Sequence, residues 1–133
     1  LFSNNEMSRF ILTNNPQVLA SYPQARRIDG GPSAVLLECR RMVHEGYPLL
    51  AHPLMGDIRL IRNPFRTVIF GEKEDEVDPT SLIWIEESID RLHSCFEEDQ
   101  RVEHKRDYQL IDFDLFQTAV KEQNHRTEQG VIL

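Results

Sequence analysis

Short apolar runs alternate with helical patterns along this chain, and this alternation constrains the fold more than any other feature. The expected strands are 9–13, a weaker one at 25–29, 49–52, 67–70 and 108–111. Apolar runs that do not alternate with polar residues are typical of parallel strands covered on both faces. We therefore expect an α/β three-layer sandwich, Rossmann-like or flavodoxin-like, in which a mostly parallel sheet of about five strands carries helices on both faces.

The helical patterns fill the gaps between these runs. The strongest begins after Asp78-Pro79, a good helix start, and is expected to end near Asp99. Its apolar residues fall at helical spacing: Leu82, Ile85, Ile89, Leu92 and Phe96. Three further helices are expected, at 16–22, at 33–45 with Ser33 as N-cap and Gly46 just past the end, and from Asp112 or Asp114 to about Glu122.

A chain of 133 residues is long enough for one core without disulfide or metal staples. We expect a single domain over residues 7–122 and a loosely held tail over 123–133. Residues 1–6 precede Met7 and are interpreted as an appended remnant or a loose tail.

Charge and cysteine usage exclude several functional classes. The formal net charge is −7, which argues against a surface for nucleic acid or for an anionic membrane. No apolar run is long enough to span a membrane. Cys39 and Cys95 form no C-x-x-C motif, and the five histidines have no metal-ligand spacing. Nucleotide-loop and nucleophile-elbow motifs are absent. We expect a cytoplasmic protein without a metal or cofactor.

A candidate binding site follows from the expected sheet. With strand order 2-1-3-4-5, the turns after the first and third strands meet at the point where the order reverses, which is where such sheets bind ligands. One turn carries Thr13, Asn14 and Asn15, and the other carries His52. The loop that follows adds further polar groups: Gly56, Arg59, Arg62, Asn63 and Arg66. Imidazole, amide and guanidinium groups together favour a small anion such as a carboxylate or phosphate.

Each of these groups also has an ordinary structural interpretation. Asn-Asn-Pro is a common turn whose side chains cap the next helix. His52 can serve only to hydrogen-bond a neighbouring carbonyl, and the arginines can pair with surface acids. Trp84 can complete the core or anchor a homodimer contact. The acidic segment 72–78 is interpreted as a solvated connector.

The sequence also resembles a known family. Phe-Ile-Leu-Thr-Asn-Asn-Pro near the start, the segment Gly46–Gly56, the run Asn63–Phe70 and Tyr108–Asp112 together are similar to the GrdX family. Thr-Asn-Asn-Pro and His-Pro-Leu-x-Gly are the most specific parts. Members are small proteins associated with the glycine reductase genes of anaerobic bacteria, and the resemblance implies no catalytic residues.

Two functional hypotheses follow. The first is a non-enzymatic accessory or small-anion-binding module, with a glycine reductase component as the partner that the resemblance implies. The second is an enzyme acting on a small polar anionic metabolite, with His52 as general acid or base, oriented by Asn14, Asp57 or Asp112. A third possibility, a purely structural role through the Trp84 face, also stays open.

Overall fold

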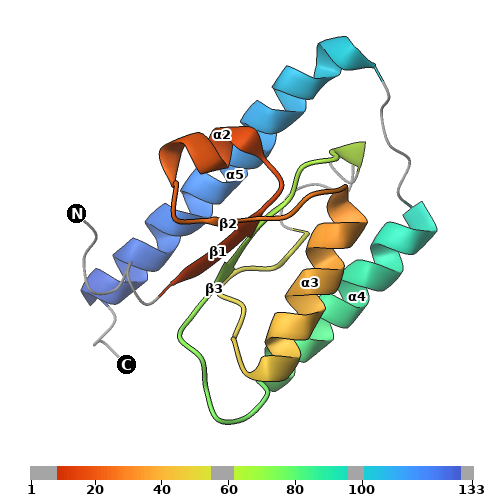
Figure 1. Ribbon diagram of the computed structural model, residues 1–133. Helices are drawn as coiled ribbons and strands as arrows, with labels where there is room; N and C mark the ends of the chain where they lie inside the picture. The colour runs from red at the N-terminus through yellow and green to blue at the C-terminus, as the bar shows by residue number, and fades with distance from the viewer. Residues whose placement is uncertain (1–8, 55–61, 96–100, 130–133) are drawn as a thin grey trace.

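The computed structural model describes residues 9–54, 62–95 and 101–129. Its elements follow one another along the chain as shown in Figure 1. They are β1 (Phe10–Thr13), α2 (Pro16–Ser21), β2 (Arg26–Arg27), α3 (Pro32–Glu45), β3 (Thr67–Phe70), α4 (Pro79–Cys95) and α5 (Val102–Gln129). The expected tail at 1–6 lies outside the described residues.

The sheet corrects the fold expected from the sequence. Within the described residues it has three strands in the order β2-β1-β3, with β2 parallel and β3 antiparallel to β1. The expectation of about five mostly parallel strands in a three-layer sandwich was therefore wrong, although a mixed α/β class is retained. The run at 49–52 contributes one bridge, from Leu49 to Phe70, because Pro48 and Pro53 flank it and interrupt backbone pairing.

The run at 108–111 is helical, which corrects a second expected strand. It belongs to α5, a helix of 28 residues that contains neither Gly nor Pro. The buried side chains Asp112, Phe116, Ala119 and Val120 recur at helical spacing along it. A run of four residues, three of them apolar, does not distinguish a strand from a buried helix segment, and the long interval without helix breakers was the better signal.

Two apolar cores lie on opposite faces of the sheet. Figure 1 shows α3 and α4 side by side on one face and α2 and α5 on the other. The larger core joins α3 and α4 to the sheet through residues such as Leu36, Phe70 and Ile89. The smaller one joins α2 and α5 to the sheet through Val18 and Phe116. Successive side chains of β3 point to opposite faces, so this one strand serves both cores.

The start of α4 positions the segment after Pro48. As predicted, Asp78 caps this helix, because its carboxylate accepts from the backbone N–H of Ser81 at 3.0 Å and from the Ser81 hydroxyl at 2.6 Å. The Ser81 oxygen in turn accepts from the backbone N–H of Leu49 at 2.8 Å. Leu50 N–H donates to Ile69 O at 2.9 Å, so the segment lies along β3 on the side away from β1.

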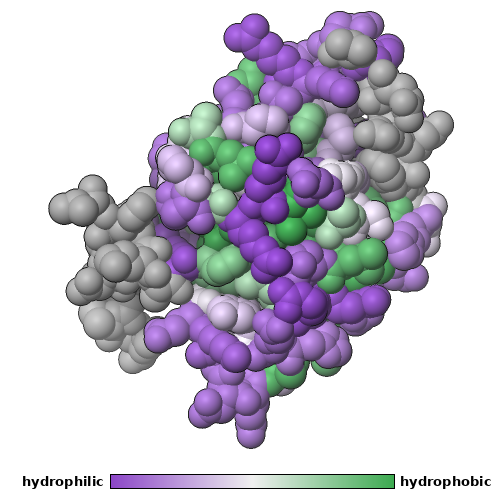
Figure 2. Space-filling model, viewed as in Figure 1, coloured by the Kyte–Doolittle hydropathy of each residue, from purple (hydrophilic) through white to green (hydrophobic). Residues whose placement is uncertain are grey.

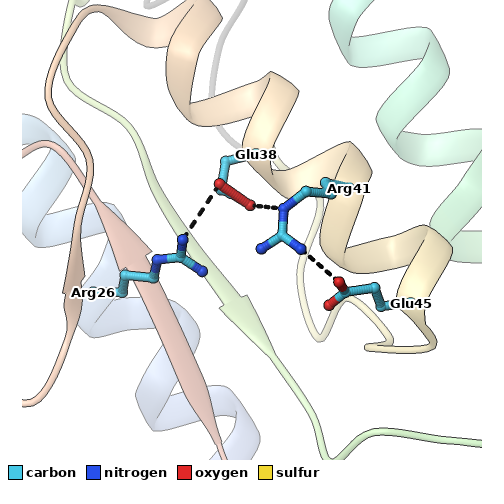
Figure 3. A network of polar contacts seen from close by, with 4 residues as sticks. All are labelled: Arg26, Glu38, Arg41 and Glu45. Carbon is cyan, nitrogen blue, oxygen red and sulfur yellow. Dashed lines mark hydrogen bonds and ion pairs between the residues drawn. The ribbon is translucent and has the colours of Figure 1, made fainter.

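Charged groups cover the edge of the sheet formed by β2. Arg26 pairs with Glu38 of α3, which also pairs with Arg41, and Arg41 reaches on to Glu45 (Figure 3). The face seen in Figure 2 is mostly hydrophilic, with apolar areas broken up by polar side chains. Charged side chains on a short edge strand discourage pairing with a second sheet.

Gly46 ends α3 in a conformation that other residues rarely adopt. Its φ is 111°, and its N–H satisfies carbonyls at the end of the helix. The carbonyl of Gly46 accepts from Glu74 N–H at 2.8 Å, which fixes the acidic segment 72–78 against the helix end. A Cβ at Gly46 would lie 2.3 Å from the Glu74 carbonyl oxygen. The backbone of Glu74, within this acidic segment, therefore packs against the end of α3.

We predict that Gly46→Ala lowers the free energy of unfolding by about 2 kcal/mol or more, because it adds strain at positive φ and a backbone clash. Urea denaturation measures the loss. Gly31→Ala is the matched control, since the φ of Gly31 is ordinary and the space around its added Cβ is open. The control should change stability by less than about 1 kcal/mol, and equal losses in both variants would contradict the prediction.

Candidate functional site

Six polar side chains are buried where the end of β1 and the start of β3 meet α5. Each has an exposed fraction of 5% or less. We call this group the polar cluster; its members are Thr13, Asn15, Asn63, Arg66, Thr67 and Asp112. Four of the six belong to the binding site expected from the sequence, so the structure does bring those residues together.

A directed series of hydrogen bonds runs through the polar cluster. The Thr67 hydroxyl donates to Asp112 Oδ2 at 2.7 Å. The hydroxyls of Thr13 and Thr67 lie 2.8 Å apart, and the Thr13 hydroxyl also donates to Arg66 O at 3.3 Å. Thr13 Oγ1 also accepts from the backbone N–H of Asn15 at 3.0 Å, and Asn15 Nδ2 donates to the same Asp112 oxygen at 2.9 Å. The series therefore ends on one carboxylate oxygen.

The asparagines hold backbone segments in place. Asn14 Nδ2 donates to Gly30 O at 3.0 Å and Pro64 O at 2.9 Å, and its Oδ1 accepts from Arg66 N–H at 2.8 Å. Asn15 Oδ1 accepts from Gln17 N–H at 3.0 Å and caps α2, which is the capping interpretation weighed above.

Asn63 acts in the same way on the loop before β3. Its Nδ2 donates to Tyr108 O on α5 at 2.9 Å, and its Oδ1 accepts from Phe65 N–H at 2.8 Å. These amides bind protein groups, and in this arrangement they fasten loops to the sheet and to α5.

Burial sets the electrostatics of the polar cluster. It raises the pKa of Asp112, against the hydrogen bonds from Asn15 and Thr67 and the positive charge of Arg66, all of which lower it. Burial likewise lowers the pKa of Arg66, and the charge of Asp112 opposes that shift. The two groups thus stabilise one another's charged forms in a site that disfavours either charge alone.

His52 occupies a different place. β3 lies between its segment and β1, so the turn after residue 52 does not adjoin the turn after β1 as the assumed strand order required. His52 instead lines a hollow of about 310 Å³, which we call the groove. The groove is lined by Leu50, Ala51, His52, Trp84, Leu115, Thr118, Ala119, Glu122 and Gln123. Of the remaining expected site residues, Arg62 is exposed, and Gly56 and Arg59 lie outside the described residues, as does Asp57.

The geometry of His52 defines its hydrogen-bonding capacity. Its Nδ1 accepts from Leu54 N–H at 3.1 Å, so the neutral ring carries its proton on Nε2. The ring lies beside Trp84, with centroids 5.5 Å apart and an interplanar angle of 47°. Partial burial lowers the pKa of His52, Arg91 lowers it further, and Glu87 opposes both. At neutral pH the side chain is therefore an uncharged N–H donor.

The far wall of the groove is α5. Gln123 Nε2 donates to Leu50 O at 2.8 Å, which joins the two walls. Arg9 also reaches α5 here, with a 2.8 Å bond to Asn124. The sequence predicted a helix over most of this wall, ending near Glu122, but it missed the start of α5 at Val102 and its continuation to Gln129. The absence of Gly and Pro over 102–129 was the signal that could have found it.

Trp84 has a double place in this arrangement. It is half-buried, packs against the larger core and lines the groove. The homodimer contact through its face stays a prediction.

We predict that Asp112→Ala lowers the free energy of unfolding by about 3 kcal/mol or more, because it removes the acceptor for two buried donors and the charge opposite Arg66. Asp112→Asn should cost clearly less, since it keeps an acceptor oxygen of the same shape. Asp114→Ala, an exposed position on the same helix, is the control for urea denaturation. A loss no greater than that of the control would contradict a stabilising role for the carboxylate.

We also predict that protonation of His52 opposes folding. The pKa is lowered in the folded state, so the unfolded chain binds the proton more tightly and stability falls as pH drops below about 6.5. The decline in the free energy of unfolding between pH 7.5 and 5.5 should be smaller in His52→Gln than in the parent protein. His44→Gln, at an exposed position on α3, should keep the parent's slope. A His52→Gln slope equal to the parent's would show that this histidine is not responsible.

Comparisons with known proteins were made for the whole chain. No curated protein and no solved structure gave a match. In the part of the chain that the structure describes, no helix has both the length and the apolar character needed to cross a membrane. Over the same residues, no group of three or more His, Cys, Asp or Glu side chains is placed to hold a metal ion. A family model described as GrdX-like protein matches residues 10–121. Since this match covers most of the chain and confirms the resemblance, the chain belongs to the GrdX-like protein family.

Proposed function

We propose that this protein is a non-enzymatic binding module that holds a small organic molecule in the groove. The observation that carries the proposal is the groove, a hollow of about 310 Å³ lined by His52 and Trp84 on one side and by α5 on the other. This volume lies at the lower end of the roughly 300 to 1,000 Å³ typical of small-molecule sites. The link to glycine reductase that the GrdX resemblance implies belongs to the same proposal, with the module as an accessory of that system.

The composition of the groove supports a binding role. Leucine, alanine and tryptophan side chains provide most of the wall, and a few polar groups stand among them: His52, Thr118, Glu122 and Gln123. An apolar wall with few polar groups gives affinity through burial and orientation through hydrogen bonds. The three contributing segments come from distant parts of the sequence, and the bond from Gln123 to Leu50 joins two of them.

The state of His52 favours binding over proton transfer. A general base needs an available lone pair, and the one on Nδ1 accepts from Leu54 N–H. The protonated Nε2 can donate to a ligand, which is a positioning task. Two of the three orienting groups considered for an enzyme are engaged elsewhere, since Asn14 bonds to loop backbone and Asp112 to Thr67 and Asn15. The third, Asp57, lies outside the described residues.

The polar cluster is less suited to a small anion than the sequence suggested. Its amide and hydroxyl groups bond to protein partners, and a buried Asp112 would repel an anion there. We therefore place the proposed ligand in the groove and not at the polar cluster.

Trp84 is the single tryptophan of the chain and lines the groove, so tryptophan fluorescence tests directly for a ligand at this site. We predict that at least one member of a panel of small cationic, neutral and anionic molecules changes Trp84 fluorescence in a saturable way. His52→Gln should lower the affinity for that ligand about fivefold, which is the effect of losing roughly one hydrogen bond.

His44→Gln is the matched control and should bind as the parent does, because His44 is exposed on α3 away from the groove. If no member of the panel changes the emission, or if both histidine variants bind equally well, the groove is not a ligand site.

A further inference from the structure

We propose that the ligand of the groove carries a positively charged ammonium group, held between the Trp84 ring and the Glu122 carboxylate. The inference rests on the proposed function and specifies the chemical class of the ligand. It depends on which charges and acceptors line the groove, rather than on its shape alone.

The charged and aromatic groups of the groove favour a cation. Glu122 is the one charged side chain in its lining, and it is anionic. The face of an indole ring is also electronegative and is the best aromatic partner for a cation. A ligand with a positive charge complements both groups.

The charges around the groove do not counter this preference. His52 is uncharged at neutral pH. The two charged side chains that act on it, Glu87 and Arg91, have opposite signs. The whole chain has a net charge of −7, which favours the approach of cations. His52 Nε2–H remains as one donor and can bind a hydroxyl, carbonyl or carboxylate elsewhere on the same ligand.

Three molecules of nearly equal shape separate charge from size. Choline carries a quaternary ammonium, 3,3-dimethyl-1-butanol replaces the nitrogen by carbon, and 3,3-dimethylbutanoate carries a negative charge. Titrations of each into the parent protein are followed by Trp84 fluorescence and by calorimetry. We expect choline to bind about tenfold more tightly than the neutral alcohol, and the anion to bind most weakly.

A charge-neutral variant tests the role assigned to Glu122. This residue is exposed on α5, so Glu122→Gln should fold normally. It should remove most of the preference for choline while binding of 3,3-dimethyl-1-butanol changes less than twofold. Glu103→Gln is the control, because Glu103 is exposed on the same helix and, 19 residues earlier, lies about 28 Å along its axis. The control should keep the preference.

The outcomes separate this inference from the proposed function. Equal affinity for choline and the alcohol, tighter binding of the anion, or a preference for choline that survives Glu122→Gln would overturn the ammonium assignment. Absence of choline binding would overturn it as well. The proposed function falls only if the wider panel, anions and neutral molecules included, also leaves Trp84 emission unchanged.

Discussion

The hydrogen bonds that Asp112 accepts hold α5 against β3 and against the start of α2. α5 covers one face of a sheet of three short strands in the described part of the chain, and its carboxylate binds both the hydroxyl of Thr67 on β3 and the amide of Asn15 at the start of α2. A long helix with a modest apolar stripe gains only part of its attachment from burial. The polar cluster fixes the alignment of α5 on the sheet, because its hydrogen bonds form in only one register of the helix against the strands.

A buried carboxylate is costly, and the way this cost is met explains the surrounding sequence. Burial raises the pKa of Asp112, while two hydrogen bonds and the nearby Arg66 stabilise its charged form. Asn14 and Asn63 hold the backbone around Arg66 and Asn63 itself reaches α5, so the loop before β3 is fastened on both sides. Of the residues expected to form a ligand site, Asn15 donates directly to this buried carboxylate, while Asn14 and Asn63 hold loop backbone in place.

The groove depends on the same attachment. One of its walls is the second half of α5, and the opposite wall is the Leu50–His52 segment with Trp84 of α4 behind it. The position of that segment is set by β3, through Ile69, and by the Ser81 and Asp78 pair at the start of α4. The two walls place His52, Glu122 and Gln123 around one small volume, which is the physical basis for proposing a binding role.

The sequence by itself determined the local elements and the family. The spacing of Leu82, Ile85 and Ile89, the Asp78-Pro79 start and the β-branched run Thr67–Phe70 each predicted an element that the structure contains, because these signals come from neighbouring residues. Only the tertiary structure decided strand direction and the separation of His52 from Asn14. Each depends on which segments pair, and residues far apart in the chain carry no local signal of that. Asp112 was expected to cap a helix and instead lies buried within one, because the donors that satisfy it come from β3 and the start of α2.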